Sequence, residues 1–308
     1  MDKMLSLIVP VYNEEEVLEL SFSRMDAVMR EIGYPYEIIY VNDGSRDGSM
    51  KILRKIAKEH PYVKVRSFSR NFGHQLAVTC GMDAAKGDAL IIIDVDLQDP
   101  PEVIKEMVKA WENGADIAYG KRVKRQGETL FKKITASAYY RLLKSMSATP
   151  IPLDTGDFRL LDRKVADVFL KMREHNRFLR GMSSWMGFEA VPIEFVRHER
   201  AAGKTKYTLK KMFKLAMDGI IGFSDRPLTL SGGLGVLTCG ISFLGLIALI
   251  VLACCSVKFP AWLWALCGLV MLHGLTLIIL CVQGAYMNRM YDELKGRPLY
   301  IVAEELNM

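Results

Sequence analysis

The stretch ALIIIDVDLQDPPE, residues 89–102, combines the signals of a strand, a turn and the beginning of a helix. Residues 89–93 contain no polar side chain, which is typical of a strand covered on both faces. Acids follow at once at positions 94, 96 and 99, and the proline at position 101 suits the first turn of a helix. This order predicts a buried parallel strand whose carboxyl end carries an acidic site.

Strand-like and helix-like segments alternate on both sides of this stretch. Such alternation predicts an α/β fold with a mostly parallel, Rossmann-like sheet and helices on both of its faces. Ligands of these sheets bind beyond the carboxyl ends of the strands. The expected strands are residues 5–11, 36–41, 63–67, 89–93 and 117–119, and the expected helices are 14–32, one that ends near 60, 75–86 and 101–113.

The paired carboxylates of Asp94 and Asp96 indicate a cation site. In an extended segment, side chains two residues apart point to the same side, so we expect both carboxylates to face the same bound cation. Their charges repel, and a divalent cation would neutralise them. Mg²⁺ and Mn²⁺ prefer carboxylate oxygens and often share them with substrate phosphates. The alternative for the pair is a solvated turn; Asp99 is expected to cap the helix that begins at Pro101.

Two further loops follow the first two expected strands. They are PVYNE (10–14) and NDGS (42–45), and both would meet the acidic turn at the same edge of the sheet. Asp43 is suited to hydrogen bonds with a base or a ribose. A simple helix cap is the alternative for this residue.

The region 228–288 predicts a transmembrane hairpin. From 228 to 282 the chain carries one charge, Lys258, and about 20 apolar residues suffice to cross the hydrocarbon. We expect spans at about 230–255 and 262–287, with a buried helical pair in a soluble core as the alternative. Lys and Arg lie before and after the hairpin, which predicts a cytoplasmic domain at 1–203 and a cytoplasmic tail at 289–308.

Basic amphipathic segments indicate further contact with a membrane surface. The segments are 126–147 within the domain and 204–227 before the first span, and each has surface packing on the core as its alternative. The net charge of +6 suits anionic lipid. No nucleic-acid-binding motif occurs, so nucleic acid is not an expected partner. Five of the six cysteines lie in the expected spans without metal-ligand spacing, which fits a reducing cytoplasm.

Several segments together resemble family 2 of the inverting glycosyltransferases, which have the GT-A fold. These are VPVYNE (9–14), VNDGS (41–45) and DVDLQ (94–98). A narrower similarity is to the polyprenyl-phosphate sugar transferases, a branch with dolichol-phosphate mannose synthases and bacterial bactoprenol (undecaprenyl-phosphate) glucosyltransferases. It is carried by DLQDPPE (96–102), TGDFRL (155–160), RFLRG (177–181) and the hairpin. The resemblance covers nearly the whole chain.

This resemblance implies roles for individual residues. The nucleoside part of a nucleotide sugar would be held by Pro10, Tyr12, Glu14 and Asp43, and Asp94 would contact the nucleotide side. Asp96 and Gln98, with Asp94, would reach the metal and the diphosphate. Asn42 stands where many relatives have a second aspartate.

Asp157 would lie near the sugar and the acceptor. Its role stays open between a catalytic base and a group that orients the sugar or stabilises an oxocarbenium-like centre. A phosphate monoester has a second pKa of about 6 and is mostly ionised near neutral pH, so it needs little deprotonation. A purely structural turn at this position is the third possibility.

Cationic residues are expected around the anionic substrates. The candidates are Arg122 for the nucleotide sugar and Arg200, Lys204 and Lys206 for the acceptor phosphate, with attraction to the membrane surface as the alternative. His74 lies close to the expected site, where it would contact a substrate. The other histidines lack metal spacing.

The predicted function is inverting transfer of a sugar to undecaprenyl phosphate at the bacterial inner membrane, with UDP-glucose as donor and Mg²⁺ or Mn²⁺ as cofactor. GDP-mannose, UDP-N-acetylglucosamine and a UDP-aminoarabinose derivative are alternative donors. A catalytically silent nucleotide-sugar-binding membrane scaffold is the alternative of another class; a processive polysaccharide synthase would need a Gln-x-x-Arg-Trp motif, which the sequence lacks. The expected partners are a separate flippase, a downstream glycosyltransferase for lipopolysaccharide O-antigen or cell-wall modification, and further copies of the chain, as in a tetramer.

Overall fold

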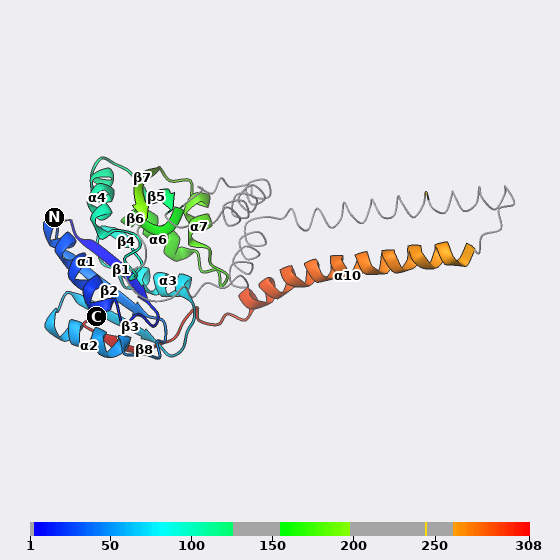
Figure 1. Ribbon diagram of the computed structural model, residues 1–308, viewed down its shortest axis with the longest axis horizontal. Helices are drawn as coiled ribbons and strands as arrows, with labels where there is room; N and C mark the ends of the chain where they lie inside the picture. The colour runs from blue at the N-terminus through cyan, green and yellow to red at the C-terminus, as the bar shows by residue number, and fades with distance from the viewer. Residues whose placement is uncertain (1–2, 126–154, 198–243, 245–260) are drawn as a thin grey trace.

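The protein folds around one eight-stranded mixed sheet, as a computed structural model describes it for residues 3–125, 155–197, 244 and 261–308 (Figure 1). The strand order is β7-β5-β6-β4-β1-β2-β3-β8. The strands are β1 (Leu5–Val11), β2 (Tyr36–Asn42), β3 (Val63–Phe68), β4 (Ala89–Ile92), β5 (Ile117–Arg125), β6 (Thr155–Asp162), β7 (Ala190–Arg197) and β8 (Val302–Leu306).

The centre of the sheet is parallel, as the sequence predicts. Strand β1 lies between β2 and β4, and β2 pairs in turn with β3, all in parallel. Val11 pairs with Asn42 and Ile8 with Ile92, so β1, β2 and β4 end at the same edge. This register brings the loops after the three strands together.

Helices cover both faces of the sheet, and each face has its own apolar cluster. On one face Leu5, Leu7 and Val9 pack with side chains of α1, α2 and α4, whereas Ile8 packs on the other face with α3, α6 and α7. Strand alternation explains this division. The helices are α1 (Leu18–Ile32), α2 (Ser49–Glu59), α3 (His74–Ala84), the 3-10 turn η1 (Pro101–Val103), α4 (Ile104–Glu112), α6 (Arg163–Lys171), α7 (Leu179–Trp185) and α10 (Ala261–Leu294).

The other half of the sheet is mixed. Strand β6 runs antiparallel to both β4 and β5, and β7 runs parallel to β5. Strand β5 continues to Arg125, well beyond the predicted 117–119. Strands β6 and β7 were not among the expected elements.

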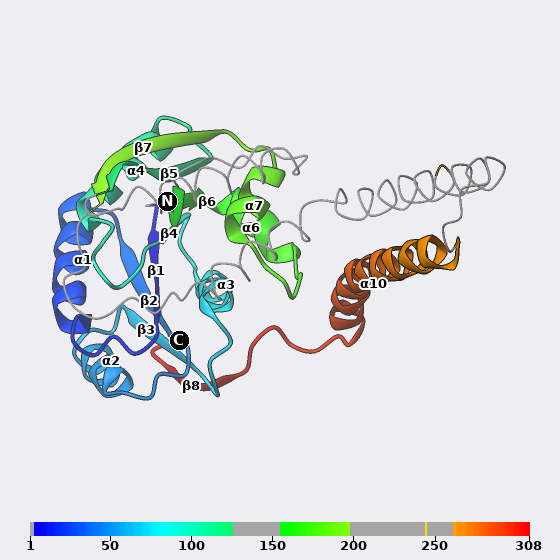
Figure 2. The ribbon, with the colours of Figure 1, turned by 45° about the vertical axis from the view of Figure 1, so that its right-hand side comes forward.

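The end of the chain returns to the sheet. Helix α10 projects away from the domain, and the chain then runs back so that β8 pairs antiparallel with β3 (Figures 1 and 2). Arg54 donates two hydrogen bonds to Glu304, and the ring of Tyr300 stacks on Phe68 with centroids 5.1 Å apart. Part of the predicted tail at 289–308 is therefore the edge strand of the sheet.

Several predicted membrane segments lie outside the described residues: the amphipathic segments 126–147 and 204–227 and the first span, 230–255. The predicted second span, 262–287, falls within the helix α10. In the described part of the chain, no helix is both long and apolar enough to cross a membrane. The membrane crossing stays a prediction.

Candidate active site

The loops after β1 and β2 are joined by hydrogen bonds. The backbone N–H groups of Asn13 and Glu14 donate to the hydroxyls of Ser45 and Ser49, each at 2.9 Å. The Asn13 side chain accepts from the N–H of Arg46 at 2.8 Å. Residues 15–17 form a turn after this joined pair of loops, and α1 begins at Leu18 and not at the predicted residue 14. Tyr12 and Glu14 are half-buried in this joined pair of loops, and Pro10 is buried within β1.

Asp43 is buried and binds the loop that leads into α3. Its carboxylate accepts hydrogen bonds from the backbone N–H groups of Phe72 at 2.6 Å and Gly73 at 3.0 Å. Burial raises the pKa of this carboxyl, while the two N–H groups oppose the shift. The predicted nucleoside-binding residue thus also fixes the position of His74, the first residue of α3.

The acidic stretch after β4 forms a turn, which corrects the expectation of an extended segment. Residues 95–96 turn the chain, and Leu97 adopts the left-handed conformation with φ 55°. The carboxylate of Asp96 accepts from the N–H of Gln98 at 3.2 Å, a local bond that favours such turns. Asp96 is buried, whereas the Asp94 side chain keeps 37% of its accessible surface.

Negative charges crowd this turn. Burial raises the pKa of Asp94 to about 6; His74 opposes the shift, and the neighbouring acids Asp96, Asp99 and Asp157 add to it. A cation bound here would relieve that repulsion. The donor set therefore fits a divalent cation.

The cation would have to share its coordination with a ligand. Within the described ranges, no group of three or more His, Cys, Asp or Glu side chains could hold a metal ion by itself. Mg²⁺ is commonly bound through one or two carboxylates together with substrate phosphates. Asp94, Asp96 and the amide of Gln98 suit that arrangement.

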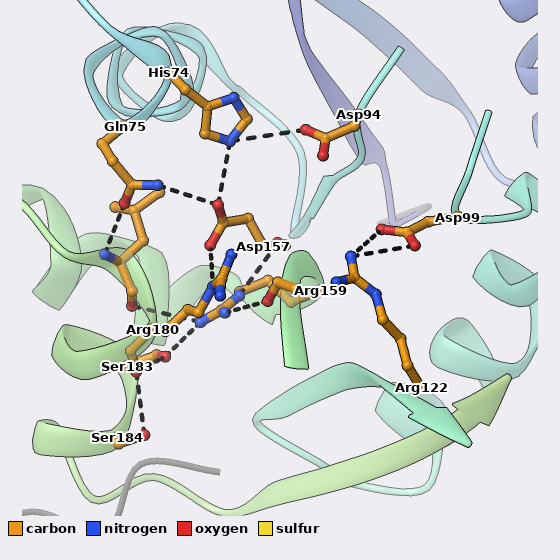
Figure 3. Close-up of polar contacts among 12 residues, drawn as sticks. His74, Gln75, Asp94, Asp99, Arg122, Asp157, Arg159, Arg180, Ser183 and Ser184 are labelled. Carbon is orange, nitrogen blue, oxygen red and sulfur yellow. Dashed lines mark hydrogen bonds and ion pairs between the residues drawn. The ribbon is translucent and has the colours of Figure 1, made fainter. Parts of the chain in front are cut away.

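Asp157, near the start of β6, lies across from this turn and is surrounded by donors (Figure 3). Arg180 Nε donates to its Oδ1 at 2.9 Å, and Gln75 Nε2 donates to Oδ2 at 3.1 Å. His74 Nε2 lies 3.2 Å from Oδ2 and 3.7 Å from Asp94 Oδ1. His74 therefore connects the acidic turn with Asp157.

The opposite charges of this cluster stabilise one another's ionised forms. Burial alone would raise the pKa of Asp157, but Arg180 and His74 hold it well below its ordinary value. Burial likewise would lower the pKa of His74, yet Asp94 and Asp157 raise it to about 9. At neutral pH the site therefore contains an ionised Asp157 beside an imidazolium and a guanidinium.

Arg159 braces the backbone around Asp157. It is 3% exposed and donates to the carbonyl oxygens of Gly156 and Asp157 and to Ser183 Oγ (Figure 3). Burial lowers its pKa to about 10. One buried guanidinium thus ties the start of β6 to α7.

Arg122 lies at the same edge and forms an ion pair with Asp99 at 3.0 Å. Both side chains are largely buried, with exposed fractions of 10% and 2%. Asp99 was expected to cap the helix that begins at Pro101. Its side chain instead pairs with Arg122, the residue predicted to bind the nucleotide sugar. The guanidinium packs so closely on Gly156 that a Cβ there would lie 2.5 Å from Nη2.

The structure brings most predicted site residues to one edge of the sheet. Arg200, Lys204 and Lys206 lie outside the described residues. The sequence did not single out Gln75, Arg159 or Arg180 for the site. Arg159 and Arg180 lie in segments that carry the family resemblance, and Gln75 directly follows His74. Their nearness to these motifs is the sequence signal that could have identified them as site residues.

Comparisons with known proteins identify the family of the chain. Residues 6–170 match the glycosyl transferase family 2 profile. An uncharacterized glycosyltransferase of Bacillus subtilis, YkcC, is 49% identical over 96% of this chain and 92% of its own length. The SfII prophage-derived bactoprenol glucosyl transferase of Shigella flexneri is 38% identical over 97% of each chain.

Among solved structures, the mannosyltransferase PcManGT of Pyrobaculum calidifontis, in complex with GDP-Man and Mn²⁺, has a TM-score of 0.44 and 16% identity, covering 97% of this chain and 89% of that chain. The family match, the near full-length relatives and the α/β sheet with its acidic turn lead to one conclusion. The chain belongs to glycosyltransferase family 2 and is a glycosyltransferase with an α/β, GT-A-like fold.

Proposed function

We propose that this enzyme transfers a sugar, glucose from UDP-glucose, to the phosphate of undecaprenyl phosphate with inversion. The observation that carries the proposal is the position of His74, which contacts both Asp94 and Asp157. The acidic turn suited to a diphosphate and the carboxylate expected near the acceptor therefore belong to one site. Relatives named bactoprenol glucosyl transferases, similar over nearly their full length, support this lipid acceptor.

Different residues at the sheet edge bind different parts of the nucleotide-sugar substrate. Pro10, Tyr12, Glu14 and Asp43 line the nucleoside side. Asp96 and Gln98, with Asp94, would hold Mg²⁺ or Mn²⁺, which would neutralise charge on the diphosphate when bound. Arg122, fixed by Asp99, contributes positive charge at the same edge.

The reaction requires no oxidant and no covalent enzyme intermediate. An acceptor phosphate oxygen forms a bond to the anomeric carbon while the bond from that carbon to the diphosphate breaks. Attack opposite the leaving group inverts the configuration. The products are polyprenyl-phosphate sugar and a nucleoside diphosphate.

A lipid acceptor places the enzyme at a membrane. The uncharged runs in 228–288 supply a hairpin anchor, and Arg200, Lys204 and Lys206 would meet the acceptor phosphate at the cytoplasmic surface. Strand β8 supports this topology, because pairing with β3 keeps the end of the chain on the side of the catalytic domain. A separate flippase, and assembly with further copies of the chain, belong to the same proposal.

Product analysis tests the donor and the acceptor together. Membranes containing the enzyme are offered radiolabelled UDP-glucose, GDP-mannose, UDP-N-acetylglucosamine and a UDP-aminoarabinose derivative, and the lipid extract is analysed. We expect label in polyprenyl phosphate from UDP-glucose. Label from another donor would correct the sugar, and no lipid-linked label from any donor would refute the lipid acceptor.

The Asp96→Asn variant tests the site assignment. Because it removes one negative ligand of the metal and diphosphate, we expect transfer to fall at least about 100-fold. Thermal unfolding monitors the fold, which should stay intact. Near-normal turnover by a folded variant would show that the acidic turn is not the diphosphate site.

A further inference from the structure

The Asp157 carboxylate is occupied on both oxygens by protein donors. Oδ1 accepts from Arg180 at 2.9 Å, and Oδ2 accepts from Gln75 at 3.1 Å with His74 Nε2 at 3.2 Å. A general base needs a lone pair directed at the proton it removes. Here protein donors already use lone pairs of both oxygens, so a role as proton acceptor would compete with these bonds.

Solvent reaches the cations of this cluster more readily than the carboxylate. The exposed fractions of the side chains are 9% for Asp157, 26% for Arg180 and 35% for His74. An approaching anion therefore encounters Arg180 and His74 before it encounters Asp157.

The start of α7, which carries Arg180, is held in a fixed position from several sides. It is the second residue of α7, whose first residue, Leu179, donates its N–H to Gln75 Oε1 at 2.9 Å. Arg159 donates to the carbonyl oxygen of Leu179 and, through the same nitrogen, to Ser183 Oγ. The helix start, Gln75 and Asp157 form one network (Figure 3).

We propose that Arg180, oriented by Asp157, binds the phosphate monoester of the acceptor, and that Asp157 acts as a positioning residue and not as the proton acceptor. The inference rests on the proposed function and adds a residue of α7 to the phosphate contacts proposed for Arg200, Lys204 and Lys206. A guanidinium presents a rigid fork of N–H donors that matches phosphate geometry, and a fixed fork loses little freedom on binding.

This assignment is consistent with the proton balance of the reaction. A phosphate monoester is mostly a dianion near neutral pH. Its oxygen supplies the electron pair for the new bond to the anomeric carbon, and the diphosphate takes the electron pair of the bond that breaks. No proton has to pass to Asp157.

Variants of full-length enzyme in detergent micelles test the proposal, with UDP-glucose and undecaprenyl phosphate as substrates. In Arg180→Gln and in Asp157→Asn we expect the KM for undecaprenyl phosphate to rise about 10- to 100-fold, because a charge-assisted contact is lost or misdirected. The Kd for UDP should stay unchanged, and Arg180→Lys should recover part of the loss. The double variant should be no worse than Arg180→Gln alone, because both changes remove the same contact.

Arg173→Gln is the matched control. It breaks an Arg–Asp pair of the same type, to Asp83 at 2.9 Å, on a more exposed side chain. Its KM for undecaprenyl phosphate should equal that of the wild type. An equal rise of KM in this control would show that loss of any surface arginine weakens acceptor binding and would overturn the assignment.

Two other results would overturn the proposal. One is an Asp157→Asn enzyme whose kcat falls at saturating acceptor while KM is unchanged, with effects that multiply in the double variant; this is the behaviour of a base. The other is an unchanged Kd of Arg180→Gln for undecaprenyl phosphate, measured by calorimetry without donor. Because that measurement needs no turnover and no Asp157 variant, it decides the inference even if sugar transfer fails or Asp157→Asn does not fold.

Discussion

At the scale of single residues, the site depends on buried charges that stabilise one another. Asp157 is 8% exposed, and a carboxylate at that depth carries a desolvation cost of several kcal/mol unless it is paired. Arg180 and His74 supply the opposite charges and Gln75 an additional donor. The position of each group is consequently sensitive to small changes in its neighbours.

The Gly156→Ala substitution tests this sensitivity. The new Cβ would lie 2.5 Å from Arg122 Nη2 and 3.1 Å from Cζ, and the ion pair with Asp99 limits how far the guanidinium can move. We expect a destabilisation of about 2 kcal/mol. Because Asp157 is the next residue, kcat/KM should fall about 10- to 100-fold.

Gly81→Ala provides the control for overpacking. Its Cβ would collide with Ile8 where α3 packs on β1. This variant should also lose stability, measured by thermal unfolding, while kcat/KM per folded molecule stays at the wild-type value. A similar loss of activity in both variants would mean that activity follows stability and not the geometry around Asp157.

The sequence located the acidic residues better than their partners. Asp94, Asp96 and Gln98 follow an apolar strand, so their place at the sheet edge could be predicted. The partners of Asp157 come from α3 and α7, and only the tertiary fold brings these helices beside the start of β6. Arg159 is a buried cation within a strand, which a hydrophobic pattern does not identify.

At the scale of secondary-structure elements, Glu37 connects four segments at the amino ends of the parallel strands. This residue of β2 accepts from Ser6 of β1 at 2.6 Å, from Lys64 of β3 at 2.5 Å and from the N–H of Lys86 at 2.6 Å. Burial alone would raise its pKa, but these three partners lower it below the ordinary value of 4.5. The ionised form is therefore the one that stabilises the sheet.

We expect Glu37→Gln to destabilise the protein by about 3 kcal/mol, because Lys64 would remain buried without its counter-charge. A lowered folded-state pKa contributes stability that is present above pH 4.5 and is lost as the pH falls below it. The difference in unfolding free energy between wild type and variant should accordingly shrink below pH 4.5.

Denaturant unfolding at several pH values measures this effect. Glu19→Gln is the control, because its ion pair with Lys55 is 62% exposed on both sides and should contribute little. A Glu37→Gln variant as stable as Glu19→Gln at neutral pH would contradict the prediction.

The elements of the parallel centre could be predicted because each strand is a short apolar run separated from the next by a helical pattern. Strand β6 escaped prediction because its TGDFRLLD sequence places buried Asp157 and Arg159 among apolar residues. Strand β8 has only five residues, two of them acidic, and its partner β3 is more than 200 positions away in the sequence. A local sequence pattern cannot predict strand pairing between segments so far apart in the chain.

At the scale of the whole molecule, β8 fastens the end of α10 to the catalytic domain. His175, in the segment between α6 and α7, lies 3.0 Å from Glu293 near the end of α10, and its Nε2 donates a hydrogen bond to the carbonyl oxygen of Arg297 at 2.8 Å. The N–H of Ser69 donates to the carbonyl of Ile301 at 3.0 Å. Helix α10 is thus attached to the domain through contacts on both sides of residue 297.

Deletion of residues 301–308 should lower the thermal unfolding midpoint by about 4–8 °C, because β3 loses its neighbour and two half-buried apolar side chains, Val302 and Leu306. Glu304→Gln is the control; it removes only the exposed pair with Arg54 and should leave the midpoint nearly unchanged. An unaltered midpoint after the deletion would show that β8 adds nothing to the stability of the domain.

The late position of β8 in the chain also has a consequence during synthesis. Strand β3 is complete at residue 68, but its neighbour begins at residue 302, so 233 residues separate them. A ribosome adds about 5–20 residues per second, so the hydrogen-bonding edge of β3 lacks this neighbouring strand for about 10–50 s. Open strand edges pair readily with other chains, and a nascent domain in this interval is therefore exposed to mispairing until the last strand arrives.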